Sequence, residues 1–131
     1  MPDRPVSYEE LTPGYKFPPA TYELSASFVS KYSKAVDGAD AGFVPPLAIT
    51  ACAIAAMAKS VPLPSGTIAI HASQELEFLG LVPVGAVIEC HIGVAQKIAR
   101  GKMSMLVLEL EIFDKGRGRI QSGRAAIALP A

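Results

Sequence analysis

One apolar run constrains the fold of this chain more than any other feature of its sequence. The stretch LAITACAIAAMAKS follows Pro45-Pro46 and is apolar on every face apart from Thr50. Proline suits the first turn of a helix, where its missing N–H has no partner to lose. A helix that is apolar on every face must be enclosed on every side. The sequence therefore predicts a buried helix at 46–59 with the rest of the chain wrapped around it, and the run is too short to span a membrane.

The hydrophobic period then changes from helical to strand-like. Apolar and polar residues alternate over 68–78, 86–98, 102–113 and 120–129, and a shorter strand at 20–24 and a helix near 28–36 precede the apolar run. Simple alternation puts His71 on the polar face of its strand with Glu75. Long antiparallel strands favour a strongly curved sheet, whose concave side can hold one helix. We predict one α+β domain over 1–131, with an extended N-terminal arm at about 1–19.

Composition narrows the partners and the compartment. Twelve basic residues balance twelve acidic ones without a basic stripe, which argues against nucleic-acid binding. Half of the residues are apolar, more than one small core needs, so we expect a dimer. Cys52 and Cys90 lie in apolar runs and the N-terminus has no apolar leader, which favours a cytoplasmic protein with free thiols. The two histidines lack metal-ligand spacing, so no metal site is expected.

Four stretches, in this order along the chain, resemble the MaoC-like hydratase/dehydratase family. Residues 32–38 (YSKAVDG) are similar to its "YxxAxGD" helix end with the last two residues transposed, and 44–47 (VPPL) to the start of its central helix. Residues 71–78 (HASQELEF) with 83–85 resemble its "HxxQ" strand, and 122–125 its closing strand. The resemblance is closest to the family's N-terminal or non-catalytic half-domains. It implies the hot-dog fold, a curved sheet wrapped around one central helix.

The resemblance also implies an activity. MaoC-like enzymes add water to, or remove it from, acyl-CoA or acyl-carrier-protein thioesters without a cofactor, using an Asp and a His five residues later. Five residues after Asp37 stands Gly42, and five after Asp40 stands Pro45. The expected function is thus a hydratase/dehydratase, or its acyl-binding subunit, as a homodimer or as a heterodimer with a catalytic hot-dog subunit. A hot-dog thioesterase and a non-catalytic partner subunit are the alternatives.

The candidate site residues follow from this comparison. The catalytic candidates are Asp37, Asp40 and His71, and the substrate-binding candidates are Val44, Pro45, Pro46, Leu47 and Ala48. Unpaired N–H groups at the first helical turn, those of Leu47, Ala48 and Ile49, would stabilise negative charge on a thioester oxygen. Simpler interpretations stay open: the carboxylates can close a turn, the histidine can pair with a surface carboxylate, and the N–H groups can bind water.

Overall fold

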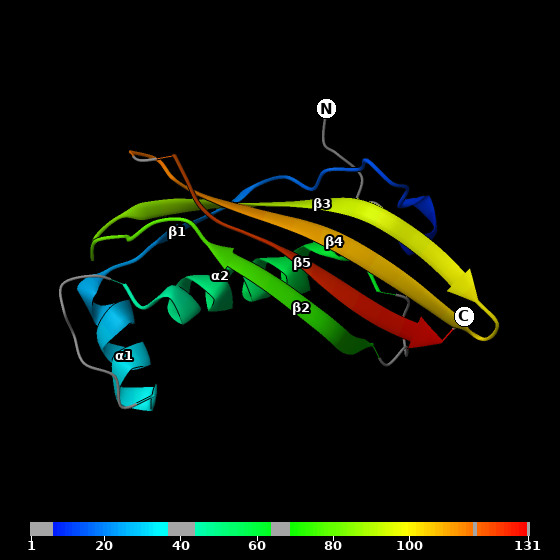
Figure 1. Ribbon diagram of the computed structural model, residues 1–131, viewed down its shortest axis with the longest axis horizontal. Helices are drawn as coiled ribbons and strands as arrows, with labels where there is room; N and C mark the ends of the chain where they lie inside the picture. Colours follow the sequence, from blue (N-terminus) through cyan, green and yellow to red (C-terminus); the bar gives the residue numbers. More distant parts are fainter. Residues whose placement is uncertain (1–6, 37–43, 64–68, 117, 131) are drawn as a thin grey trace.

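The computed structural model describes residues 7–36, 44–63, 69–116 and 118–130. A short 3₁₀ helix, two α-helices and five strands follow one another along the chain (Figure 1). In order they are η1 (Tyr8–Glu10), β1 (Ala20–Glu23), α1 (Ala26–Val36), α2 (Pro46–Ser60), β2 (Ile70–Phe78), β3 (Val87–Arg100), β4 (Met103–Asp114) and β5 (Gly118–Pro130).

The five strands form one antiparallel sheet in the order β1-β3-β4-β5-β2. The sheet curves, and α2 lies along its concave side, as Figure 1 shows. This arrangement confirms the predicted α+β architecture of a curved sheet around one helix. Strand β2 is an edge strand that pairs only with β5 among the described strands, so its outer edge carries unpaired backbone groups.

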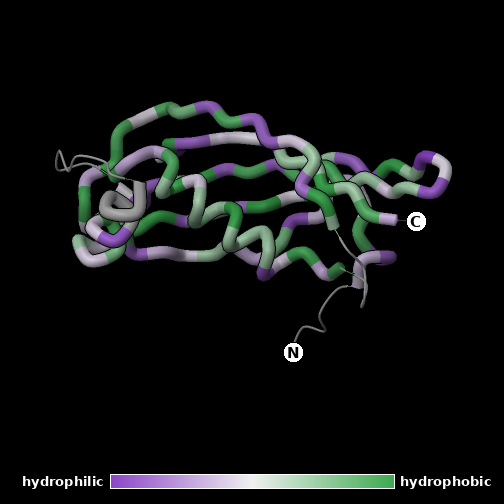
Figure 2. Tube along the Cα trace, turned by 90° about the horizontal axis from the view of Figure 1, so that it is seen from below, coloured by the Kyte–Doolittle hydropathy of each residue, from purple (hydrophilic) through white to green (hydrophobic). Residues whose placement is uncertain are grey.

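The core lies between α2 and the concave face. In β4 every second side chain is buried, namely those of Leu106, Leu108, Leu110 and Ile112, each at most 2% exposed. The alternation that predicted this strand therefore marks its two faces correctly, and it is visible in the colours of the strands in Figure 2.

Helix α2 is buried on one side only. Ala48, Ile49, Cys52, Ala53, Ala56 and Met57 are buried, whereas Leu47, Ala51, Ala55 and Ala58 are exposed. The prediction that this helix is enclosed on every side is thus wrong for a single chain, because the sheet covers one side of it. We call the four exposed residues the open strip of α2.

The described part of the N-terminal arm packs against β3 and the start of β4. Hydrogen bonds of 2.7–2.9 Å tie residues 14–17 to β3, beyond the end of β1. The Tyr8 hydroxyl lies 2.7 Å from Ser104 Oγ, and Lys97 Nζ donates to the Tyr8 carbonyl oxygen at 2.8 Å. The buried side chains of Leu11 and Phe17 join the core. Within the described ranges no helix is long and apolar enough to cross a membrane.

Candidate functional site

Two buried polar side chains, those of Gln121 and Thr50, hold the first turn of α2 against β5, and we call their hydrogen bonds the polar lock. Gln121 and Thr50 are only 2% and 5% exposed. The Gln121 side-chain amide donates to the Pro46 carbonyl oxygen at 2.9 Å, and Thr50 Oγ1 donates to Gln121 Oε1 at 3.1 Å. Buried polar groups are stable only when they are paired in this way. The pairing therefore fixes the position of the helix N-terminus relative to the sheet.

The free donors at this helix end are fewer than expected. Pro45 is the N-cap, and its carbonyl oxygen accepts a hydrogen bond of 2.9 Å from the N–H of Ala48. The expectation of an unpaired N–H at Ala48 is thus wrong, because the first turn closes on the N-cap carbonyl. The N–H of Leu47 comes too early in the helix to have an intrahelical acceptor. The side chain of Leu47 is 58% exposed beside it.

The other predicted binding residues shape the approach to this helix end. Val44 is buried, and its N–H donates to the Val82 carbonyl oxygen at 2.7 Å. Pro45 is half-buried, and Pro46 is exposed at the first helical position. Asp37 and Asp40 lie outside the described residues, so their part in a site stays a prediction.

His71 lies on the opposite face of β2 from the one predicted. It pairs with Ile127 of β5, and Gln74 pairs with Ala125, with a register shift between the two pairs. Directly paired residues point to the same face, and both β5 partners are buried core residues. His71 therefore shares the concave face with Gln74 and not the convex face with Glu75. The prediction assumed an unbroken alternation, and a β-bulge reverses it by one residue.

Gln74 orients the ring of His71. The Gln74 side-chain amide nitrogen lies 3.4 Å from the Glu75 carbonyl oxygen and 3.3 Å from that of Arg124, so it is the donor to both. Gln74 Oε1 is then the atom that faces His71 Nε2, at 3.0 Å. Because an amide oxygen only accepts, Nε2 is the atom that donates to Gln74, and Nδ1 is the ring nitrogen left over. Nδ1 has no partner among the residues that the structure describes.

His91 lies on the convex face and has a partner there. Its Nε2 lies 2.7 Å from Glu89 Oε1, and its ring meets that of Phe113 edge-on at 5.1 Å. The two histidines are on opposite faces of the sheet and do not form a common site. No group of three metal-ligating side chains occurs in the described part of the chain.

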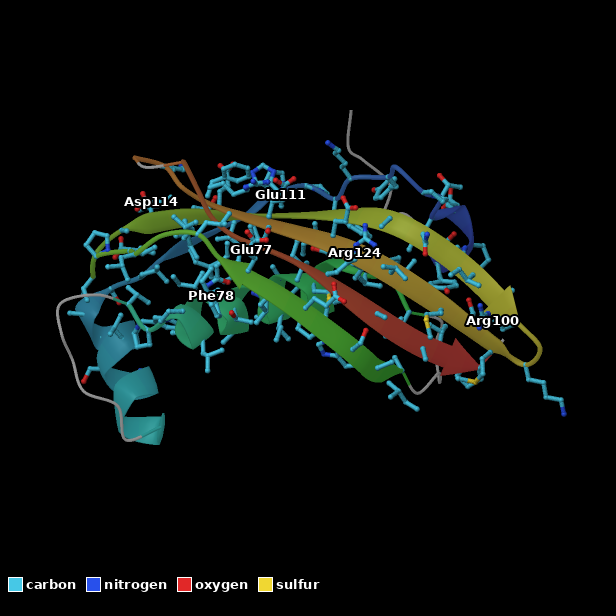
Figure 3. The ribbon with its side chains drawn as sticks, in the orientation of Figure 1. Glu77, Phe78, Arg100, Glu111, Asp114 and Arg124 are labelled. Atoms are coloured by element: carbon cyan, nitrogen blue, oxygen red, sulfur yellow. The ribbon has the colours of Figure 1, made fainter. Side chains whose placement is uncertain are left out.

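The charged residues of the sheet gather on the convex face. Arg124 donates to Glu109 at 3.0 Å and Arg119 donates to Glu111 at 3.2 Å. Figure 3 places Glu111 and Arg124 on the side away from α2, and Phe78 on the side of α2. The concave side near α2 is thus the apolar one.

Both cysteines are unsuited to nucleophilic chemistry. Cys52 and Cys90 are free and buried. Burial raises the pKa of both thiols, that of Cys90 to about 12. A thiol with such a pKa holds almost no thiolate at neutral pH, and the thiolate is the reactive form. These side chains serve packing.

Solved structures share this fold along most of the chain. An R-hydratase, PhaJ1 from Pseudomonas aeruginosa, has a TM-score of 0.79 at 17% identity, with 96% of this chain and 90% of that chain covered. A MaoC-like dehydratase from Rhodospirillum rubrum has a TM-score of 0.75 at 15% identity, with 95% and 97% covered. These likenesses confirm the predicted hot-dog fold and the predicted resemblance at the level of the fold.

The same fold also occurs in proteins described in other terms. A thioesterase superfamily member from Thermus thermophilus has a TM-score of 0.71 at 15% identity, with 92% of this chain and 85% of that chain covered. A chain of the ChsH1-ChsH2 complex from Mycobacterium tuberculosis has a TM-score of 0.70 at 12% identity, with 90% and 98% covered. No protein-family model matches the sequence, and no curated protein matches it.

Proposed function

We propose that this chain is an acyl-thioester hydratase/dehydratase, or the acyl-binding subunit of one, which takes an acyl-CoA or acyl-carrier-protein thioester and needs no cofactor. The observation that carries the proposal is the near full-length fold match to an R-hydratase and a MaoC-like dehydratase. The locked first turn of α2 supports it, because a rigid N–H donor is what a developing oxyanion requires. Two buried free thiols fit a reducing compartment such as the cytoplasm.

The proposed reaction adds water across the double bond of an enoyl thioester. A carboxylate, Asp37 with Asp40 in reserve, takes a proton from water as the water oxygen bonds to C3. The π electrons move toward C2 and the carbonyl oxygen, where the Leu47 N–H stabilises the enolate. A proton is then returned to C2, and the dehydration reaction runs the same steps in reverse. General acid–base groups contribute about 10²–10⁴-fold each to such a rate.

A second chain completes the proposed protein. The outer edge of β2 and the open strip of α2 are left uncovered by the described chain. We propose that β2 pairs with β2 of a second copy, or of a catalytic hot-dog subunit, so that two sheets join into one with both central helices on the same side. The ChsH1-ChsH2 complex supports a partner of this kind, since it joins two different chains, one of which has this fold.

Hydration of crotonyl-CoA tests the activity. The absorbance of the conjugated double bond should fall slowly with wild-type protein, and not at all with Asp37→Asn. Fast hydration that survives the loss of both Asp37 and Asp40 would place the site elsewhere. If the protein binds butyryl-CoA and leaves crotonyl-CoA unchanged, the acyl-binding subunit is the correct form of the proposal.

A hot-dog thioesterase is the alternative, and the fold match to a thioesterase superfamily member favours it. In that reaction Asp37 or Asp40 would activate water against the thioester carbonyl carbon, and free CoA would leave. Release of free thiol from butyryl-CoA, which has no double bond to hydrate, separates this reaction from hydration.

A further inference from the structure

We propose that His71 of one copy contributes its Nδ1 atom to the thioester site of the other copy, next to the N-terminus of that copy's α2. This inference rests on the dimer and the ligand class of the proposed function. It adds a residue and a direction: the histidine acts across the subunit boundary and not in its own chain.

Within one chain His71 is too far from the locked helix end. The α2 N-terminus is bonded to Gln121, which lies directly opposite Phe78 at the far end of β2. Six residues lie between His71 and Phe78, and because one of them is bulged the distance is about 20 Å. A histidine at this position cannot reach a ligand held at the N-terminus of its own helix.

Two-fold pairing of β2 removes this distance. In an antiparallel pair of identical strands, residues on either side of the centre exchange places, and the centre of Ile70–Phe78 is Gln74. The bulged residue Ala72 is skipped in this pairing. If the two-fold axis passes through Gln74, His71 of one copy lies opposite Leu76 of the other. If the axis passes through Glu75, His71 lies opposite Phe78. Gln121 of that other copy then lies two strand spacings away, about 10 Å.

The bulge is what makes this placement useful. A two-fold axis perpendicular to the sheet keeps concave side chains concave, and the bulge puts His71 on that face. In the proposed pair it faces the exposed, apolar ring of Phe78 of the other copy. The convex face, where simple alternation would have put it, is covered with paired Glu and Arg side chains instead.

The chemistry of the ring suits a proton-transfer role. Gln74 holds Nε2 as the donor, so Nδ1 is the atom free to take up or give a proton. In the proposed hydration the carboxylate removes a proton from water, and C2 must receive one. Protonated Nδ1 donates that proton to C2, and the neutral ring regains a proton from the carboxylic acid by way of solvent. The sequence from Asp37 to Pro45 contains no histidine for this step.

Cysteine cross-linking tests the placement across the two copies. His71→Cys and Phe78→Cys chains, mixed and treated with a short bis-maleimide, should give a covalent dimer, and neither variant alone should do so. The native thiols are buried and should not react. His91→Cys mixed with Phe78→Cys is the matched control, because His91 lies on the convex face, and it should stay uncross-linked. A dimer in sedimentation that gives no 71–78 cross-link overturns this inference and leaves the proposed function standing.

Imidazole nitrogen NMR tests the ligand contact. Butyryl-CoA should shift the Nδ1 signal of His71 and leave that of His91 in place. His71→Gln should weaken butyryl-CoA binding about tenfold, the loss expected for one hydrogen bond to the ligand, whereas His91→Gln should not. Binding that shifts neither ring, or both alike, contradicts the inference. If butyryl-CoA does not bind at all, the proposed function itself fails.

Discussion

A single buried amide, that of Gln121, determines how the first turn of α2 is held. Nothing near it in the sequence identifies it, because its partners Thr50 and Pro46 are 71 and 75 residues away. The only signal was Thr50, the one polar residue in an otherwise apolar run. A polar residue in such a run needs a partner, but its identity follows only from the way β5 crosses the helix.

Replacing Gln121 should therefore destabilise the protein. Gln121→Leu leaves the Thr50 hydroxyl and the Pro46 carbonyl oxygen with one partner fewer in the core, which costs about 1–3 kcal/mol. Urea unfolding would measure this loss. Gln96→Leu is the control, since Gln96 is an exposed strand residue, and it should change stability by less than about 0.5 kcal/mol. Equal losses for the two variants would show that the lock contributes nothing.

The thiol of Cys90 predicts the alkaline behaviour of the fold. Its pKa is raised by burial from 9.0 to about 12, so between these values the unfolded chain loses the proton and the folded chain keeps it. Stability from this group is complete below pH 9 and is lost as the pH rises toward 12, by a few kcal/mol in all. Melting temperatures across this range should fall for the wild type and less steeply for Cys90→Ala. Parallel curves would contradict the assignment.

At the scale of elements, hydrophobic periodicity predicted where helices and strands lie along the chain, but not which residues surround each of them. The helix predicted at 46–59 is Pro46–Ser60, and the strand predicted at 102–113 is Met103–Asp114, because each pattern is written in consecutive residues. The face of His71 could not be read this way, since the bulge arises from pairing with a strand some fifty residues later. The open strip of α2 was missed for a related reason: composition shows that a helix needs cover, not how much one chain supplies.

The two sides of α2 should respond differently to one buried charge. Ala53 is 1% exposed, so Ala53→Asp forces an unpaired carboxylate into the core and should cost about 3–5 kcal/mol, enough to prevent soluble expression. Ala55→Asp, in the open strip, should fold as a single chain and weaken the dimer. Melting temperature and sedimentation of both variants measure these effects. An Ala53→Asp protein with an unchanged melting temperature would mean that the buried side of α2 has been misassigned.

The whole molecule is predicted to be a dimer through β2. Sedimentation at micromolar concentration should give twice the chain mass of 13.7 kDa. Outward-facing amides of β2 should then be protected from hydrogen exchange, because a second strand pairs with them. A monomer would exclude the homodimer and leave a different hot-dog subunit as the partner. Protection of β2 amides only after that subunit is added would identify the heterodimer.

The extra residue in β2 has a consequence for how this protein can vary. Successive side chains of a strand alternate between its two faces, and the bulge between His71 and Gln74 shifts this alternation by one position. Deleting Ala72 would remove the bulge and leave His71 on the concave face, because His71 and Ser73 already pair with the consecutive residues Ile127 and Ala126 of β5. A substitution changes the side chain at a position but not the face of the strand on which that position lies. A one-residue shift of Ile70 and His71 along β5, with Ala72 kept, would instead close the bulge and move an unchanged histidine out of the shared face. The pairing of this short segment with β5 therefore decides what the histidine can reach, although no residue changes.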